Sequence, residues 1–508
     1  MSPRDQDETT PLLAAQNDCN DLHDLHAKRT PLPLFQFSIV LFLQLAEPLT
    51  SNVIYPFAPQ LMRDIGITEG DETKVGYYVG IMQSIFFLTQ AMTVLHWSRI
   101  SDRLGRKPII LTGLLGLSIS MFCFGLSRTF WGPRREPKSK WRVEREHWSN
   151  KKYRRRTDRL DKYSPGMRYP TSVSRHSDVL FIKAYAFMPI SWSTGSTLGP
   201  IIGGSLARPA DRFPDLFGDN QFLRKYPYFL PCAVPATFSL VAWAVTFLFL
   251  EETAVGPSVL SIPPLFRRKG DIDTAKREFV VEDGTPALER IEEPVPPLRA
   301  LLIPPVIVAA GNYALLSLVD ISLRAIHPVF LSTPIELGGL GMSTSRIGNI
   351  LSIFGILNGF VQVFFFRRIH DYMGSKKTFI LGIASALPTF AAFPFLNYLA
   401  RAQGMNMLVW TAALLHIIVS IGLSFSYGAV FIYISAAAPS RSALGATNGL
   451  SQLSVSIMRA IGPATANSLY SLSMEKQYMR GYMYCYVLIA VTCVALWVGS
   501  LLPRRPGA

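Results

Sequence analysis

The chain has 508 residues and a formal net charge of +15, with 49% hydrophobic and only 17% charged residues. Soluble proteins carry about 25% charged residues on average, so this composition argues against a string of soluble domains and indicates a multi-span membrane protein. Five scattered cysteines without a CxxC pair predict neither a disulfide framework nor a metal site.

The first 33 residues are polar and acidic. They lack the basic and apolar regions of a cleavable signal peptide, so we expect residues 1–33 to form a disordered cytoplasmic N-terminus. Within them, Glu8-Thr9-Thr10-Pro11-Leu12-Leu13 fits an acidic dileucine sorting signal, although chance often produces so short a pattern. The sequence therefore leaves a vacuolar or endosomal membrane and the plasma membrane open as locations.

Eleven predominantly apolar stretches follow, and each approaches the roughly 20 residues that a membrane-spanning helix needs. Because lipid offers no hydrogen-bond partner to the backbone, such stretches predict helices. The expected fold class is an all-α polytopic membrane protein. The stretches lie near residues 35–57, 76–97, 109–128, 184–206, 228–250, 300–331, 346–366, 378–399, 408–433, 444–471 and 482–502.

A polar stretch divides these apolar segments into two groups. We expect an N-terminal helical bundle over residues 34–250 and a cytoplasmic linker over 251–298. A C-terminal helical bundle over 299–503 and a short tail over 504–508 follow. The linker is read as a solvated connection between two bundles.

The two groups repeat one another at an offset of roughly 263–272 residues. Three matches occur in the same order, which indicates two related bundles with a substrate site at their interface near the middle of the membrane. The matches are Arg99–Lys107 with Arg368–Lys376, Gly199-Pro200 with Gly462-Pro463, and Tyr55-Pro56 with His327-Pro328.

Ser98-Arg99-Ile100-Ser101-Asp102-Arg103-Leu104-Gly105-Arg106-Lys107-Pro108 resembles the loop signature of the major facilitator superfamily. The segment with Gly195, Gly199 and Pro200 resembles the fifth-span motif of its drug:proton antiporter branch. The flanking sequence, including Pro56-Phe57-x4-Met62-Arg63-Asp64 and Leu206–Phe217, is similar to zinc-induced-facilitator-like proteins and their fungal relatives. This resemblance implies twelve spans in two pseudo-repeated six-helix bundles, alternating access, and proton-coupled export of a small solute.

The resemblance also assigns roles to two sets of residues. A charged turn between spans is expected to hold one conformation and release it in the other, with glycine allowing positive φ. Small residues of the antiporter-type motif are expected to let helices approach closely, although ordinary helix packing explains them equally well. The first set is Arg99, Asp102, Gly105, Arg106, Lys107, Arg368, Asp371 and Gly374; the second is Gly195, Gly199, Pro200, Gly203 and Gly204.

Ionisable residues inside membrane spans are costly, so they are candidates for function. Glu47 and Asp320 lie in stretches that correspond through the repeat, and we predict both as proton or cation sites. Arg324 is expected to be the charge partner of Asp320, four residues away on one helix face, where a purely structural ion pair is the alternative. Arg459 is either buried in the pathway or extended to the interface.

One segment does not fit this organisation. Residues 133–183 carry 16 Lys and Arg against 6 Asp and Glu, in the place where the resemblance implies a fourth span. A basic residue at a helix centre costs about 2.5–3.5 kcal/mol, so this segment predicts no membrane helix. Eleven spans are therefore evident where twelve are expected, with residues 132–183 as an aberrant basic segment.

We interpret this segment as a frame or splice error in the coding sequence. A fourth span typical of relatives contains Asn-Gly-Ala-Leu, and reading its codons one nucleotide early gives Lys140-Trp141-Arg142-Val143. The same shift accounts for the segment back to Pro133, and it removes the family's fourth-span arginine, which would stand at position 137. A genuine basic cytoplasmic insert and a nucleic-acid-binding arm are the alternatives.

The sequence thus predicts a secondary active transporter that exchanges protons for a small organic or metal-chelating solute. No GxxxxGK[ST] loop appears, which argues against an ATP-driven pump, and no nucleophile–base cluster indicates an enzyme. We expect no cofactor, no metal and no nucleic acid, and a monomer whose partners are the bilayer, the solute and protons. A non-transporting sensor on the same scaffold and an inactive product of the frame error remain alternatives.

Overall fold

The computed structural model describes residues 34–104, 106–127, 191–250, 302–439 and 443–504. The described chain is almost entirely helical, so the all-α prediction is confirmed. The expected N-terminal tail, the basic segment 133–183 and the linker 251–298 lie outside the described residues. The expected domain boundaries therefore stay predictions.

The described helices of the N-terminal half come first in the chain. They are α2 (Leu34–Gln44), α3 (Ala46–Ile54), α4 (Ala58–Ile65), the 3-10 turn η1 (Glu72–Lys74), α5 (Val75–Leu104), α6 (Arg106–Leu126), a helix over residues 191–206, α8 (Pro209–Arg212), α9 (Pro214–Phe217), α10 (Gln221–Lys225) and α11 (Phe229–Phe249).

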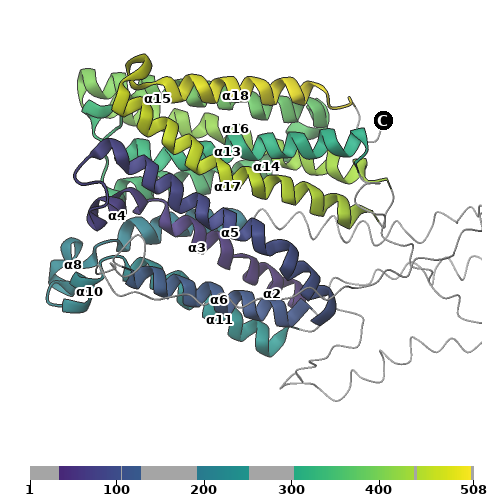
Figure 1. The fold of residues 1–508 in the computed structure, drawn as a ribbon, viewed down its shortest axis with the longest axis horizontal. Helices are drawn as coiled ribbons and strands as arrows, with labels where there is room; N and C mark the ends of the chain where they lie inside the picture. The colour runs from purple at the N-terminus through teal and green to yellow at the C-terminus, as the bar shows by residue number, and fades with distance from the viewer. Residues whose placement is uncertain (1–33, 105, 128–190, 251–301, 440–442, 505–508) are drawn as a thin grey trace, which may run out of the picture.

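The C-terminal half contains longer helices. They are α13 (Pro304–Ser332), η3 (Ile335–Leu337), α14 (Thr344–Ala384), α15 (Ala386–Gln403), α16 (Met407–Ala437), α17 (Leu444–Lys476), η4 (Tyr478–Gly481) and α18 (Met483–Ser500). Figure 1 shows them as one group beside the N-terminal helices, with the long axes of the spans running in a common direction.

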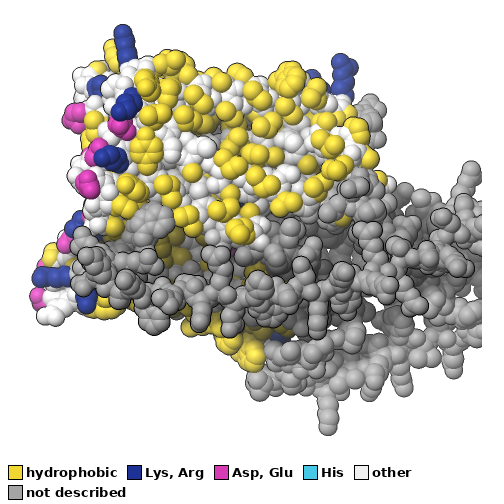
Figure 2. Space-filling view, viewed as in Figure 1, with side chains coloured by type: hydrophobic (Ala, Val, Ile, Leu, Met, Phe, Trp, Pro, Cys, Tyr) yellow, Lys and Arg dark blue, Asp and Glu magenta, His cyan; other side chains and the backbone are white. Residues whose placement is uncertain are grey.

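Seven of the described helical segments are long and apolar enough to cross a membrane, and one of them, Thr344–Gln403, covers two of the predicted stretches. Apolar side chains also dominate the flank of the C-terminal half, whereas charged side chains gather towards the ends (Figure 2). Helices α5 and α17 are helical over predicted stretches but are not among the seven. They pack along each other between the halves (Figure 1), and some of their polar residues, such as Ser84 on α5 and Asn467 on α17, are buried.

Small residues bring the two halves together. The helix over residues 191–206 contacts α3 through Gly203, where a Cβ would overlap the carbonyl oxygen of Val53. Its next residue, Gly204, faces the other half, where a Cβ would stand 2.8 Å from Cα of Gly348 on α14. The antiporter-type glycines therefore place this helix between the first span and the C-terminal half.

The turn predicted at Gly374 is present within α14. Gly374 has φ 75° and ψ 163°, a conformation that side-chain-bearing residues rarely adopt, and it ends one span and begins the next. Beside this turn, Lys376 donates to the carbonyl oxygens of Ser500 and Leu502, and the Tyr433 hydroxyl donates to that of Pro503. The end of α18 is thereby attached to α14 and α16.

The two ends of the bundle differ in what they carry. We call the end with α4, α8, α9 and α10 the distal end (Figure 1). The opposite end carries the α5–α6 connection and the Gly374 turn, and we call it the loop-motif end. If the N-terminus is cytoplasmic, as the sequence predicts, the loop-motif end is cytoplasmic as well.

Candidate functional site in the central cavity

A cavity of about 50 Å³ lies between the two halves. The N-terminal half contributes residues of α3 and of the helix over 191–206, and the C-terminal half contributes residues of α13, α14 and α16. Such a position, between two repeated bundles, is where transporters bind their solutes. The lining residues are Asn52, Tyr55, Ser196, Pro200, Asp320, Leu323, Arg324, His327, Leu351, Phe354 and Ser420.

Asp320 and Arg324 form an ion pair in the cavity wall. Nε of Arg324 lies 2.9 Å from Oδ2 of Asp320 and 3.0 Å from Oδ1, one helical turn apart on α13. The Tyr427 hydroxyl on α16 donates a 2.8 Å hydrogen bond to the same carboxylate. The ion pair that the sequence left open is thus present, and it is also part of the cavity.

Arg459 on α17 lies next to this pair. Its Nε donates a 3.3 Å hydrogen bond to the Ser317 hydroxyl, and its guanidinium lies against the Tyr427 hydroxyl. It is half-buried and within electrostatic range of Asp320. Its side chain thus points to α13 and α16 within the protein, and its role in transport stays a prediction.

Glu47 does not join the cavity lining. It lies in the first turn of α3 and is exposed, while Asn52 and Tyr55 further along the same span line the cavity instead. Within the described part of the chain, its carboxylate has no hydrogen bond or ion pair. The structure therefore brings Asp320, Arg324 and Arg459 together and leaves Glu47 apart.

The loop-motif residues lie at the ends of spans. Arg99 and Asp102 are in the last turns of α5, and Gly105 falls outside the described residues. At the start of α6, Arg106 is exposed and Lys107 is buried.

In the repeated turn, Arg368 is exposed, and Asp371 lies 3.6 Å from Arg367 and 3.5 Å from His370. The ionic partner of Asp371 is thus the arginine one position before the repeated motif.

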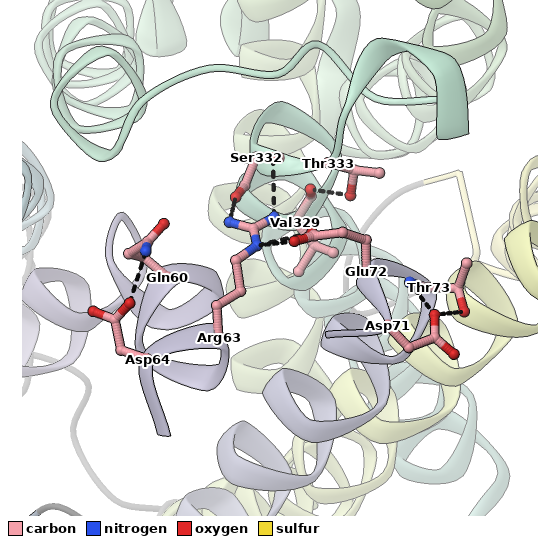
Figure 3. Close-up of polar contacts among 9 residues, drawn as sticks. All are labelled: Gln60, Arg63, Asp64, Asp71, Glu72, Thr73, Val329, Ser332 and Thr333. Atoms are coloured by element: carbon pink, nitrogen blue, oxygen red, sulfur yellow. Dashed lines mark hydrogen bonds and ion pairs between the residues drawn. The ribbon is translucent and has the colours of Figure 1, made fainter. Parts of the chain in front are cut away.

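A second polar cluster ties the halves together at the distal end (Figure 3). Arg63 at the end of α4 holds Glu72 through Nε at 2.8 and 3.0 Å. Its Nη1 donates a 2.7 Å hydrogen bond to the Ser332 hydroxyl and its Nη2 a 3.1 Å bond to the Ser332 carbonyl, at the end of α13. One guanidinium therefore joins the N-terminal half to the C-terminal half.

Arg212 makes a similar connection nearby. Its Nη1 donates to the carbonyl of Gly204 and its Nη2 to the Ser345 hydroxyl at the start of α14, both at 2.7 Å. We call Arg63, Arg212, Ser332 and Ser345 the distal clamp. The clamp closes the distal end, because its charge-assisted bonds cross the interface and are stronger than neutral ones.

The loop between α4 and η1 is itself held in place. Asp71 accepts hydrogen bonds from the backbone N–H of Thr73 at 2.9 Å and from its hydroxyl at 2.6 Å (Figure 3). The Thr73 side-chain bond lowers the pKa of Asp71, so its carboxylate stays ionised into the acidic range. This cap orients Glu72, the next residue, towards Arg63.

Sequence reasoning did not assign roles to several of these residues. Arg63 and Arg212 appear there only within flanking motifs that carry the family resemblance, and Tyr427 is an ordinary tyrosine in an apolar stretch. The signal that was available for the two arginines is their place in a short polar stretch between two apolar stretches, each beside an aspartate. Within the described residues, no group of three or more His, Cys, Asp or Glu lies close enough to hold a metal ion.

The profile of the Major Facilitator Superfamily matches residues 40–133 and 173–463, well over half of the chain. The chain belongs to the Major Facilitator Superfamily. The resemblance to this superfamily is thereby confirmed, and the chain is an integral multi-pass membrane protein. The two matched ranges leave residues 134–172, the core of the basic segment, unmatched.

Curated relatives match at low identity over nearly their whole length. "Major facilitator-type transporter psiT2" of Psilocybe cyanescens is 26% identical, over 96% of this chain and 93% of its own. "Protein ZINC INDUCED FACILITATOR 1" of Arabidopsis thaliana is 25% identical, over 94% and 92%. "Efflux pump azaK" of Aspergillus niger is 26% identical, over 99% and 96%. Together they support a membrane transporter.

Solved structures share the fold. A D-xylose-proton symporter superposes with a TM-score of 0.56 at 13% identity, covering 94% of this chain and 99% of its own. A bacterial homologue of the human lysosomal transporter Spinster, in an inward-facing and occupied conformation, gives a TM-score of 0.54 at 12% identity, covering 93% and 97%. The major-facilitator fold with two helical bundles is confirmed.

Proposed function

We propose that this transporter exchanges a small solute for protons by alternating access, with the central cavity as the binding site. The observation that carries the proposal is a cavity between the halves whose wall contains the Asp320–Arg324 ion pair. Burying an ionisable pair at that depth costs free energy, which makes the pair a candidate for function. When its ion pair with the arginine breaks, the carboxylate can accept a proton.

The distal clamp supports the alternating part of this proposal. Arg63 and Arg212 hold the halves together at the distal end, so this conformation is closed there. The distal end can open only when both connections break, and the conformation with this end open would be the second state. Solute binding would then shift the balance between the two states.

The proposal is tested by solute-dependent proton flux in proteoliposomes with an imposed pH gradient. A panel of small solutes is offered to the 508-residue chain and to a version whose frame is restored over residues 133–183. We expect proton movement with at least one solute, faster in the restored version because it regains a fourth span. Absence of coupled flux in both versions across the panel would reject proton exchange. An in-frame transcript encoding Lys140–Lys151 would reject the frame interpretation.

A first prediction concerns the distal clamp. Arg63→Gln removes the charge that bridges Glu72 and Ser332. Hydrogen bonds to charged groups contribute about 1.5–3 kcal/mol, so the distal end should open about tenfold more often or more. The reporter is a cysteine at Asn467, which is fully buried against Gly80 in the α5–α17 interface, in a background without other cysteines. Its reaction with a membrane-impermeant maleimide should accelerate accordingly.

Arg401→Gln is the matched control. Arg401 also lies at the distal end and also donates to backbone carbonyls, those of Ile335 and Glu336, but these belong to its own half. Its loss should leave the labelling rate of the reporter unchanged. Equal rates in the two variants would show that Arg63 does not hold the halves together.

A further inference from the structure

Among the residues that the structure describes, the charges in and beside the cavity wall do not balance; Asp320 and Arg324 line the cavity and Arg459 lies next to them, outside the lining. Two guanidiniums, those of Arg324 and Arg459, stand beside a single carboxylate, that of Asp320. Within the described residues, the other polar groups in electrostatic contact with them are the hydroxyls of tyrosine and serine, which carry no charge near neutral pH. Counted over the described residues, the cluster therefore holds one more positive charge than negative charge, inside the membrane-spanning part of the protein.

The uncompensated charge belongs to Arg459. The carboxylate of Asp320 is already engaged by Nε of Arg324 and by the Tyr427 hydroxyl. Arg459 has only hydroxyl partners, Ser317 and Tyr427, among the described residues. Glu47, the other acid of the first span, lies apart from this cluster and contributes nothing to its balance. A guanidinium in this position is expensive unless an anion joins it.

The cavity also offers a surface for an apolar body. Tyr55 and Phe354 line it from opposite halves, and the Arg324 guanidinium lies 5.7 Å from the centre of the Phe354 ring. Behind the charges, the rings of Tyr313 and Tyr427 meet edge to face with centroids 6.2 Å apart. Aromatic walls with a few placed charges are typical of sites for amphipathic small molecules.

We infer that the solute is an amphipathic organic monoanion. The uncompensated charge of Arg459 beside the cavity balances its carboxylate or similar group, while its apolar body packs against Tyr55 and Phe354 in a cavity that widens from its present volume of about 50 Å³. This inference rests on the proposed transport function and names the class of solute for the same cavity. A guanidinium presents parallel N–H donors that match a carboxylate, which a point charge does not. The anion would complete the charge balance that the protein leaves open.

Binding to the purified 508-residue chain in detergent tests this directly. The probes are benzoate, benzamide and benzamidinium, which share one shape and differ in charge. We expect benzoate to bind at least about tenfold more tightly than the other two, as hydrogen bonds between charged groups imply. Binding is read by titration calorimetry and by the rise in unfolding temperature, which grows with ligand concentration relative to Kd.

Variants connect the preference to Arg459. Arg459→Gln should weaken benzoate binding about tenfold or more and abolish the discrimination against benzamide. Arg459→Lys keeps the charge without the planar donor pair, so it should retain part of the preference. Arg401→Gln removes the same charge from the surface of the same half and should bind benzoate as the unaltered chain does. Monodisperse elution of each variant shows that it is folded.

Several outcomes would overturn the inference. Benzamidinium or benzamide binding as well as benzoate would reject an anionic solute, and unchanged benzoate binding by Arg459→Gln would reject the site. Stabilisation by chloride equal to that by benzoate would point to an inorganic anion instead. Proton flux driven only by neutral or cationic solutes would support proton exchange and reject an anionic solute. Arg459-dependent benzoate binding without any coupled flux would support the anion site and reject proton exchange.

Discussion

Asp320→Asn is expected to abolish solute-dependent proton flux and to destabilise the protein. The carboxylate is the only acid that the structure places against Arg324 within the described residues, and it also accepts from Tyr427. Asparagine can neither release nor take up a proton, and it leaves the guanidinium without its counter-charge. Breaking one partner of a fully buried ion pair costs about 3–5 kcal/mol, and the loss should be smaller here because the Asp320 and Arg324 side chains are 13% and 24% exposed. Flux in proteoliposomes and thermal unfolding in detergent measure the two effects.

The double variant with Asp320→Asn and Arg324→Gln separates these effects. Removing both charges leaves no unpaired ion, so much of the lost stability should return, whereas proton coupling should stay absent. Asp215→Asn, an exposed acid on α9, serves as the control and should change neither property. Full coupling in folded Asp320→Asn protein would remove Asp320 from the proton pathway.

Gly203→Ala is the second change with a large expected effect. A Cβ at this position overlaps the Val53 carbonyl oxygen, which is backbone and cannot rotate away. Overpacking a tight contact costs about 1–3 kcal/mol, occasionally more. The helix over 191–206 would move away from the first span and disturb both the Gly204–Gly348 contact and the cavity wall. We expect a lower unfolding temperature in detergent and reduced transport.

Gly116→Ala on α6 is the matched control. It is also a glycine inside a helix, but an added Cβ there meets nothing within 4 Å. Alanine is the better helix former by about 0.5–1 kcal/mol, so this variant should be as stable as the unaltered chain or slightly more so. If both variants unfolded at the same temperature, close approach at Gly203 would not be what positions the helix.

Much of the fold could be predicted because it follows from residues that are close in the sequence. A run of about 20 apolar residues is long enough to cross a membrane as a helix. Gly374 marks a turn because positive φ excludes most side chains, and the structure has that turn. Asp320 and Arg324 could be paired because four residues make one helical turn. Each of these inferences needs only neighbours along the chain.

The rest depends on contacts between distant segments. Arg63 and Ser332 are 269 residues apart, and no local pattern brings them together. The repeat pairs the span of Glu47 with the span of Asp320, and on that basis the sequence predicts Glu47 as a site like Asp320. In the structure, Asn52 and Tyr55 of that span line the cavity, and Glu47 does not. The repeat identifies corresponding helices, but the rotation of each helix about its axis follows from packing.

The attachment of the last turn of α18 has a practical use. Because Lys376 and Tyr433 hold the carbonyls of Ser500, Leu502 and Pro503, this segment moves as one body with α14 and α16. Leu501 lies among them with its side chain 55% exposed. A spin label or fluorophore introduced there would be a fixed reference point on the C-terminal half, from which the displacement of the other half can be measured during turnover.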